Sequence, residues 1–416
     1  MPFHRTMRTL EETLGRVDSS VDDMVRTMIE MTRIPALAPF NGGDGEGRKA
    51  DYLETQLRGF DTVERVDVPD WHDPSVMRAN ILARKVGPSK GTVWVVAHMD
   101  VVPTGNPDLW DTPPFDPVYR DGKVYGRGTE DNGQSVISSI FASRACMDQE
   151  LHGMSMGVAL VADEETSSKA GIEYLLDHGY FSEDDVIYVP DWGTPGGTMV
   201  DVSEKHMLWI RVEVLGKTAH ASNPDSGINA YRVSTCLLMD LLDELERTFD
   251  DTDSMFSPSR STFEPTKRPA TVENINTIPG NDEFCMDIRL LPQHRPDDVM
   301  EVIRKIAAEH AERSGAEITV EEVMKEVSGK PSSLDTRGFE VLSDSVELVT
   351  GARPAPKGIG GGTCANFFRL KGLDAYVWQC GGGTLHAPNE HVVVKDMLTD
   401  TKVFAAIYHR LCVSGE

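Results

Sequence analysis

Four short runs of the chain are apolar at almost every position, and this feature constrains the fold more than any other. A half-exposed strand alternates apolar and polar residues, whereas a strand covered on both faces is apolar throughout. Helical patterns fill the intervals, for example at residues 135–147 and 169–178. The alternation predicts an α/β fold with a mostly parallel central sheet whose crossovers are helices. The four runs are residues 92–97, 157–162, 186–189 and 375–380.

A different pattern begins at His206. Residues 207–214 alternate as a half-buried strand does, a helix is predicted at 228–248, another alternating strand ends at 286–290, and a second helix spans 296–313. This order predicts an inserted α+β unit of the ferredoxin-like, β-α-β-β-α-β kind. We therefore expect one domain formed by residues 1–205 and 324–416, interrupted by a smaller domain at 206–323. The small domain leaves a sheet edge that a homodimer can cover.

Length and charge limit the classes of partner. A chain of 416 residues is long enough for two domains. Its 67 acidic and 41 Lys and Arg residues give a net charge of −26, which repels nucleic acid and anionic lipid. We find no apolar run of membrane-spanning length and no signal-peptide core, and the six cysteines are scattered. We expect a cytoplasmic protein with no nucleic-acid or membrane partner.

Metal-capable side chains follow each of the four apolar runs. In open α/β sheets, ligands bind at the carboxyl ends of the strands. A glycine-rich turn at 126–131 adds one more carboxylate, Asp131. Two imidazoles and several carboxylates at one edge predict two Zn²⁺ ions, with Co²⁺ or Mn²⁺ as metals that accept similar sites. In chain order the strand-end residues are His98, Asp100, Glu164, Glu165, Asp191 and His386.

The spacing of these residues suggests distinct roles. Asp131 is our expected bridge, because a carboxylate can join two ions about 3.5 to 4 Å apart. Asp100 lies two residues after His98, so its carboxylate can orient that imidazole. Adjacent glutamates at a strand end point in different directions. We therefore predict Glu165 as a ligand and Glu164 as the general base that takes a proton from the activated water and passes it to the leaving amine.

Four motifs in this order resemble the dinuclear zinc metallopeptidases. That family includes succinyl-diaminopimelate desuccinylase, acetylornithine deacetylase, aminoacylase, glutamate carboxypeptidase and carnosinase-like dipeptidases, and the resemblance covers nearly the whole chain. It implies metal ligands at His98, Asp131, Glu165, Asp191 and His386, with Glu164 as base and Asp100 as orienting residue. The motifs are Ala97-His98-Met99-Asp100-Val101-Val102-Pro103, Gly126-Arg127-Gly128-x-x-Asp131, Asp163-Glu164-Glu165 and Gly383-x-x-His386.

The resemblance also assigns roles outside the metal site. It implies that the inserted domain is a lid or dimerisation domain of a homodimer, and that His220 reaches the partner's active site to stabilise the oxyanion. It implies substrate-binding roles for Asn276 and for Arg289, whose guanidinium suits a substrate carboxylate. The loop Gly361-Gly362-Thr363 is similar to the family loop that binds substrate through its backbone. Three alternatives remain open: His220 can cap or pack within the lid, Arg289 can pair with Asp287, and Gly360 to Thr363 can be only a tight turn.

Departures from the family pattern bear on the substrate. Cys364-Ala365 follows Gly361-Gly362-Thr363 where many desuccinylases and deacetylases have Ser-Asp. Asn132-Gly133-Gln134 stands where Lys-Gly is common, and residue 191 is Asp rather than the Glu of desuccinylases. We expect a metal-dependent amidohydrolase acting on an N-acyl amino acid with a free carboxylate. The alternatives are a metallo-dipeptidase or carboxypeptidase on short peptides and, remotely, a catalytically silent metal-binding scaffold.

Overall fold

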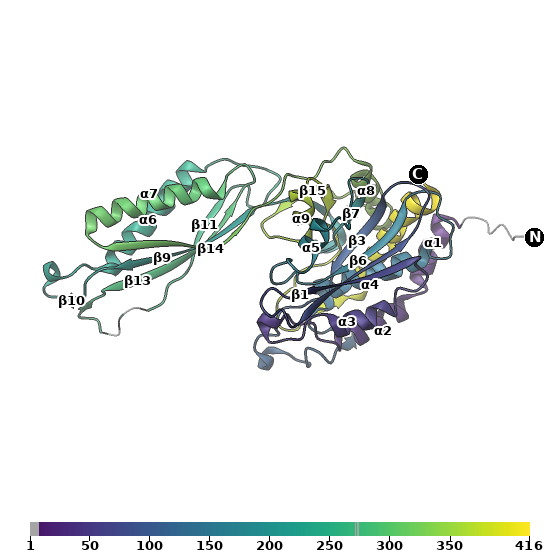
Figure 1. The fold of residues 1–416 in the computed structure, drawn as a ribbon, viewed down its shortest axis with the longest axis horizontal. Helices are drawn as coiled ribbons and strands as arrows, with labels where there is room; N and C mark the ends of the chain where they lie inside the picture. The colour runs from purple at the N-terminus through teal and green to yellow at the C-terminus, as the bar shows by residue number, and fades with distance from the viewer. Residues whose placement is uncertain (1–7, 271, 273) are drawn as a thin grey trace, which may run out of the picture. The chain divides into compact units, whose positions relative to one another are not determined.

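The structure, a computed structural model, describes residues 8–270, 272 and 274–416 and contains two compact units (Figure 1). The first unit contains the chain up to Val202, Pro331–Pro356 and Thr363–Glu416. The second contains Ser203–Lys330 and Lys357–Gly362. Strands β8 (Met199–Glu204) and β15 (Ala355–Ile359) lie where the chain passes between the units.

A six-stranded sheet forms the centre of the first unit, in the order β1-β2-β6-β3-β7-β16. Strands β6, β3, β7 and β16 run parallel to one another, and β2 is antiparallel to both β1 and β6. The predicted α/β class with a mostly parallel sheet is therefore confirmed. The strands are β1 (Thr62–Pro69), β2 (Met77–Lys85), β3 (Thr92–His98), β6 (Ser155–Val161), β7 (Val186–Tyr188) and β16 (Ala375–Tyr376).

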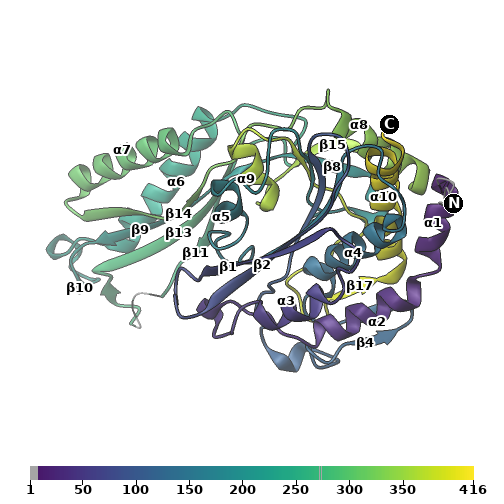
Figure 2. The same ribbon diagram turned by 45° about the vertical axis from the view of Figure 1, so that its right-hand side comes forward.

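Helices cover both faces of this sheet (Figure 2). Apolar side chains of α2, α3, α4 and α10 pack on one face, and those of α5 and α9 pack on the other. Every residue of β3 and β6 is buried, as their near-continuous apolar sequences require. The helices of this unit are α1 (Leu10–Asp18), α2 (Val21–Thr32), α3 (Gly47–Glu54), α4 (Gln134–Cys146), α5 (Ile172–Asp177), α8 (Arg337–Thr350), α9 (Cys364–Leu370) and α10 (Val394–Tyr408).

Shorter elements complete the first unit. A three-stranded sheet has the order β17-β5-β4. Its strands are β4 (Val118–Arg120), β5 (Lys123–Tyr125) and β17 (His391–Val393), and the short helical turns are η1 (Pro39–Asn41), η2 (Pro107–Leu109), η3 (Thr129–Gly133), η4 (Pro195–Gly197) and η6 (His409–Ser414).

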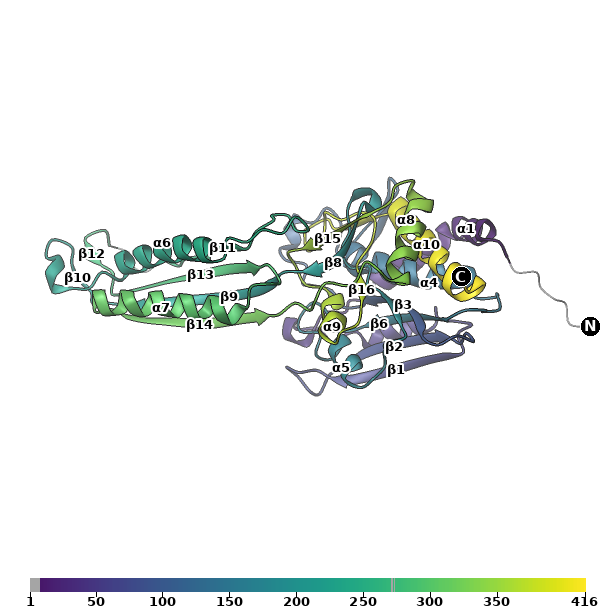
Figure 3. The ribbon, with the colours of Figure 1, turned by 90° about the horizontal axis from the view of Figure 1, so that it is seen from above.

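The second unit is a four-stranded antiparallel sheet with two helices on one face (Figure 3). Its strand order β11-β13-β9-β14 and its chain order give the ferredoxin-like arrangement that the alternating pattern predicted. Asn229 caps α6, and a left-handed glycine, Gly315, ends α7. The elements are β9 (His206–Leu215), β10 (Ala219–His220), η5 (Pro224–Ser226), α6 (Ala230–Thr248), β11 (Thr262–Lys267), β12 (Thr277–Ile278), β13 (Asn281–Leu290), α7 (Pro296–Ser314) and β14 (Glu317–Glu326).

Two predicted elements are shorter than expected. The run at 375–380 continues β16 only to Tyr376, because Val377 and Cys380 then bridge to Asp201 and Thr194 instead of to β7. The helix expected at 169–178 begins at Ile172, since the preceding residues form a loop tied to Asp163. Across the described residues, we find no helix that is long and apolar enough to cross a membrane.

Candidate metal centre

The metal-capable residues of the first unit meet at one edge of its sheet. His98 is the last residue of β3, Glu164 and Glu165 follow β6, and Asp191 follows β7. These three strands are parallel neighbours, so their carboxyl ends share an edge. Asp131 reaches the same place from η3, just before α4.

The side chains form two donor groups that share one carboxylate. His98 Nε2 lies 2.9 Å from Asp131 Oδ1 and 3.2 Å from Asp191 Oδ1. His386 Nε2 lies 3.0 Å from the other Asp131 oxygen, Oδ2, and 3.1 Å from Glu165 Oε2. Each group combines one imidazole with two carboxylates, and Asp131 contributes one oxygen to each. This arrangement is the one that the predicted bridging role of Asp131 requires.

Glu164 lies beside the first group. Its Oε2 is 4.0 Å from His98 Nε2, farther than the oxygens of Asp131 and Asp191. The ligand atoms of His98, Glu164 and Asp191 nevertheless lie within 4.8 Å of one another, as do those of His98, Asp131 and Glu165. Distance alone therefore leaves Glu164 able to serve as a ligand, but the longer separation from His98 favours its role as a base.

The donor set fits a divalent cation. Glu165 Oε1 is buried and has no hydrogen-bond partner, although a buried carboxylate oxygen normally has one. Imidazole nitrogen with carboxylate oxygen is the ligand chemistry of catalytic zinc. The His386 side chain is 57% exposed, so the second group remains open to solvent.

The electrostatics of the cluster point the same way. Burial, followed by the charge of Asp191, raises the pKa of Glu164 well above its usual range. Burial is also the main reason that the pKa of Glu165 rises to about 7. For His98, burial lowers the pKa, but the carboxylates, Asp191 first, outweigh it and the net shift is upward. Several carboxylates are thus crowded where a cation or protons must balance them.

Asp100 supports the two glutamates as well as His98. Its Oδ1 and Oδ2 accept the main-chain N–H groups of Glu164 at 3.1 Å and Glu165 at 3.0 Å. His98 Nδ1 lies 3.1 Å from the Asp100 carbonyl and 3.6 Å from its carboxylate, so the carbonyl is the nearer acceptor for the imidazole. The carboxylate therefore holds the glutamate loop more directly than it holds the ring, which the i, i+2 spacing did not indicate.

Glu390 is a supporting residue that no motif or spacing in the sequence indicated. It is fully buried, and its Oε1 accepts the N–H groups of Glu130 and Asp131, both at 3.0 Å. Its Oε2 pairs with Arg127 at 2.6 Å. Asn132 plays a similar part for Asp191, whose Oδ1 accepts from Asn132 Nδ2 at 2.7 Å. Asn132, which departs from the family pattern, thus contacts the predicted ligand Asp191.

A buried arginine anchors the loop that carries the glutamates. Arg78 on β2 is 0% exposed and pairs with Glu46, with Asp70 at 2.8 Å and with Asp163 at 2.8 Å. Asp163 precedes Glu164 and has a left-handed φ of 65°. Its carboxylate also accepts from the hydroxyls of Thr166 and Ser167. In the sequence, Arg78 stands out only as a charged residue within a mostly apolar strand. That pattern does not show which carboxylates it pairs with.

The remaining predicted residues lie mainly in the second unit. His220 on β10 is exposed, and its Nδ1 accepts from the Ser222 main chain at 3.2 Å. Asn276 is exposed, and its carbonyl accepts from Ala221 N–H at 2.8 Å. Gly361 and Gly362 also belong to this unit, whereas Thr363 is in the first unit and caps α9.

Arg289 is already paired within the chain. Its Nε and Nη2 donate to Asp287 at 2.6 and 2.9 Å, and its Nη1 donates to the carbonyl of Gly360 at 2.8 Å. This is the alternative raised from the sequence. A substrate carboxylate would have to compete with Asp287 for this guanidinium.

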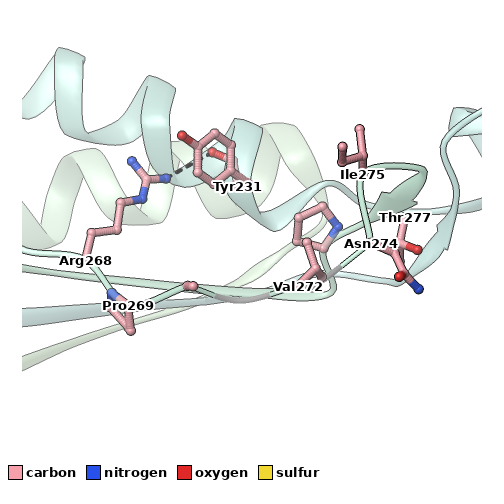
Figure 4. A pocket seen from close by; sticks show the side chains of 9 residues that line it. Tyr231, Arg268, Pro269, Val272, Asn274, Ile275 and Thr277 are labelled. Carbon is pink, nitrogen blue, oxygen red and sulfur yellow. Dashed lines mark hydrogen bonds between the residues drawn. The ribbon is translucent and has the colours of Figure 1, made fainter.

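A surface cavity of about 530 Å³ lies in the second unit (Figure 4). The guanidinium of Arg268 packs 4.2 Å from the ring centre of Tyr231 at its wall, and Ile275 and Thr277 line the opposite part. Arg268 is paired with Asp282 at 2.6 Å. The cavity therefore offers solvent mainly apolar and neutral polar groups, and its lining includes none of the predicted site residues.

Comparison of the sequence with known proteins identifies the family of the chain. Residues 94–410 match the family described as Peptidase family M20/M25/M40. The chain belongs to this family. An uncharacterized metallohydrolase of Methanocaldococcus jannaschii is 34% identical over 408 residues, which cover 93% of this chain and 99% of that relative. The resemblance predicted from the four motifs is confirmed, and membership of the family makes the chain a metallohydrolase.

Two further proteins are similar to the chain over almost its whole length. A succinyl-diaminopimelate desuccinylase of Gluconacetobacter diazotrophicus is 28% identical over 391 residues, covering 92% of this chain and 95% of that protein. A solved dipeptidase structure from Saccharomyces cerevisiae has a TM-score of 0.73 at 18% identity, covering 97% of this chain and 98% of that chain. The structural likeness shows that the fold is shared.

Proposed function

We propose that this metallohydrolase cleaves the amide bond of an N-acyl amino acid with a free carboxylate, using two Zn²⁺ ions per subunit. The observation that carries the proposal is the division of the Asp131 carboxylate between His98 and His386. When bound, the two ions would supply Lewis-acid polarisation of the scissile carbonyl and a lowered pKa for the attacking water.

The side chains have separate tasks in this reaction. His98, Asp131 and Asp191 would hold one ion, and His386, Asp131 and Glu165 would hold the other. Glu164 takes the proton from the attacking water and delivers it to the leaving amine nitrogen. Its burial supports this role, because a carboxylate with a raised pKa can hold the proton between the two steps. Asp100 keeps both glutamates in place through their main-chain N–H groups.

The second unit and its residues belong to the same proposal. We assign it as a lid and dimerisation domain of a cytoplasmic homodimer, in which His220 donates to the oxyanion in the partner's active site. Asn276, Arg289 and the loop Gly361-Gly362-Thr363 are proposed to bind substrate. These roles follow from the family resemblance, and each is testable by substitution.

The preference for an N-acyl amino acid rests on the desuccinylase relative, which matches 92% of this chain. The second candidate is hydrolysis of dipeptides or other short peptides. One sequence feature favours it: Cys364-Ala365 follows Gly361-Gly362-Thr363, as in the Thr-x-Ala of some bacterial dipeptidases. Asp at position 191 argues only against a desuccinylase, because aminoacylases and dipeptidases both have Asp there.

A substrate panel tests both candidates. The Zn²⁺- or Co²⁺-loaded protein is assayed on N-acetyl, N-succinyl and N-formyl amino acids and on dipeptides, with an EDTA-treated sample and a Glu164→Gln variant as controls. Chelator-sensitive cleavage of acyl amino acids alone supports the proposal. Cleavage of dipeptides alone would support the second candidate instead. A protein that binds metal but cleaves no member would favour the silent scaffold.

A further inference from the structure

A lysine is buried directly behind the strand end that carries His98. Lys49 lies on α3 and is only 4% exposed. Its Nζ donates to the main-chain carbonyl of Met99 at 2.8 Å. Met99 lies between His98 and Asp100, so the ammonium is bonded to the short segment that presents both side chains to the site.

The surroundings of this ammonium are dry and acidic. The recess that Lys49 lines together with His98 and Met99 has no volume that a water molecule can occupy. Burial lowers the pKa of Lys49 to about 8, while the charges of Asp100, Glu46 and Glu390 act in the opposite direction. A buried cation that water does not reach is stabilised only by nearby opposite charges such as these carboxylates. Asp100 and Glu390 also bind main-chain N–H groups of the site, and Glu46 pairs with Arg78.

Residue 133 also borders this recess, but it cannot contribute a cationic side chain. Gly133 lines the same recess, and a Cβ there would lie 2.3 Å from the carbonyl oxygen of Gly128. A side chain at 133 is therefore excluded while η3 keeps its shape. Lys49 on α3 supplies positive charge behind His98, together with Arg78, whose Nη2 lies 3.8 Å from Asp100 Oδ2.

We infer that Lys49 is a positioning residue for the centre that contains His98. Its ammonium fixes the carbonyl of Met99, and thereby sets the directions of the His98 imidazole and the Asp100 carboxylate. It also balances the acidic charge that is buried behind them. The inference rests on the proposed metal site, because positioning matters only if the His98 centre binds a cation.

Cobalt binding to the metal-free protein tests the role without any assay of activity. The titration is followed by visible absorption in a His386→Ala background, which leaves only the His98 centre complete. Adding Lys49→Met should weaken cobalt binding by about 10- to 100-fold, the usual effect of losing a residue that orients a ligand, and should change the cobalt spectrum. Leu53→Ala is the matched control, since Leu53 is fully buried on the same helix and is not part of the recess lining.

The outcomes separate this inference from the proposed function. If neither the unmodified protein nor the His386→Ala protein binds cobalt, the proposed metal site is wrong. If cobalt binds in both, and Lys49→Met has the same affinity and spectrum as its parent, the role of Lys49 is wrong. If Lys49→Met does not fold, Lys49→Gln tests the charge alone, because its amide can still donate but carries no charge. Unchanged cobalt affinity and spectrum in Lys49→Gln would overturn the role of the ammonium charge.

Chemical rescue separates positioning from a purely structural role. Lys49→Ala removes the ammonium and opens space where it lay. Ethylammonium ion should restore cobalt affinity and the parental spectrum in this variant, whereas ethanol at equal concentration should not. Equal effects of the two additives, or no effect of either on a folded variant, would overturn the assignment of the positive charge.

Discussion

Glu390 Oε1 accepts the main-chain N–H of Asp131 at 3.0 Å, although the two residues lie 259 positions apart in the sequence. The bond fixes the backbone of the residue whose carboxylate is shared by both donor groups. We predict that Glu390→Gln lowers the affinity for the first and second metal ion by about 10- to 100-fold, as expected when a residue that orients a ligand is changed. Metal titration of the chelator-treated protein measures this. Glu150→Gln, an exposed change in the same unit, should leave both affinities as they are.

The shared carboxylate makes a prediction about metal stoichiometry. Asp131→Ala removes an oxygen from both groups, so it should abolish binding of both ions. Asp191→Ala or His386→Ala removes a donor from one group only, and should leave about one ion per subunit. Elemental analysis after dialysis decides between these results. One ion retained by Asp131→Ala would contradict a bridging role.

The arginine network predicts a large loss of stability. Arg78→Met leaves the carboxylates of Glu46, Asp70 and Asp163 buried without their cation, and breaking a buried pair in this way costs about 3 to 5 kcal/mol. The free energy of unfolding of the first unit, followed by urea titration, measures the change. Arg48→Met replaces an exposed arginine on α3 and should have little effect. Similar losses for the two variants would refute a special role for Arg78.

The sequence predicted the parts of this protein that follow local rules. Buried parallel strands are apolar throughout, so the runs that became β3 and β6 stood out, and ligand residues at their ends could be assigned to one edge. The alternation in β9 predicted the inserted sheet. Even the pair of Arg289 with Asp287 was available as an alternative, because residues two apart on a strand share a face.

The supporting residues follow no local rule. Glu390 and Arg78 each act through partners that folding brings from distant segments, and the residues next to them in the sequence do not show which partners these are. Lys49 on α3 resembles a surface lysine until the helix is packed behind β3. Burial and long-range pairing decide these roles, and both depend on tertiary structure rather than on pattern.

The acidic composition predicts that salt stabilises the fold. A net charge of −26 produces self-repulsion that is strongest in the compact state. Raising KCl from about 0.1 to 1 M shortens the screening length from about 10 to 3 Å, so the melting temperature should rise. Near pH 5, close to the sequence pI of 4.8, the same step in salt should raise it less. An equal rise at both pH values would point to an effect other than screening.

Metal binding should release protons and become stronger as the pH rises. Hydrogen bonds to Asp131 and Glu165 raise the pKa of His386 to about 10, and the pKa of His98 is also raised in the metal-free site. His386 is therefore protonated at pH 7, and the upward shift favours the protonated form of His98, whereas a metal ligand must be neutral. Each ion must displace such a proton, so the apparent affinity falls as the pH falls. Calorimetric titrations in buffers with different ionisation enthalpies count the protons released. His386→Ala should release fewer protons than the unmodified protein, and a binding heat that does not depend on the buffer would show that the imidazoles are already neutral.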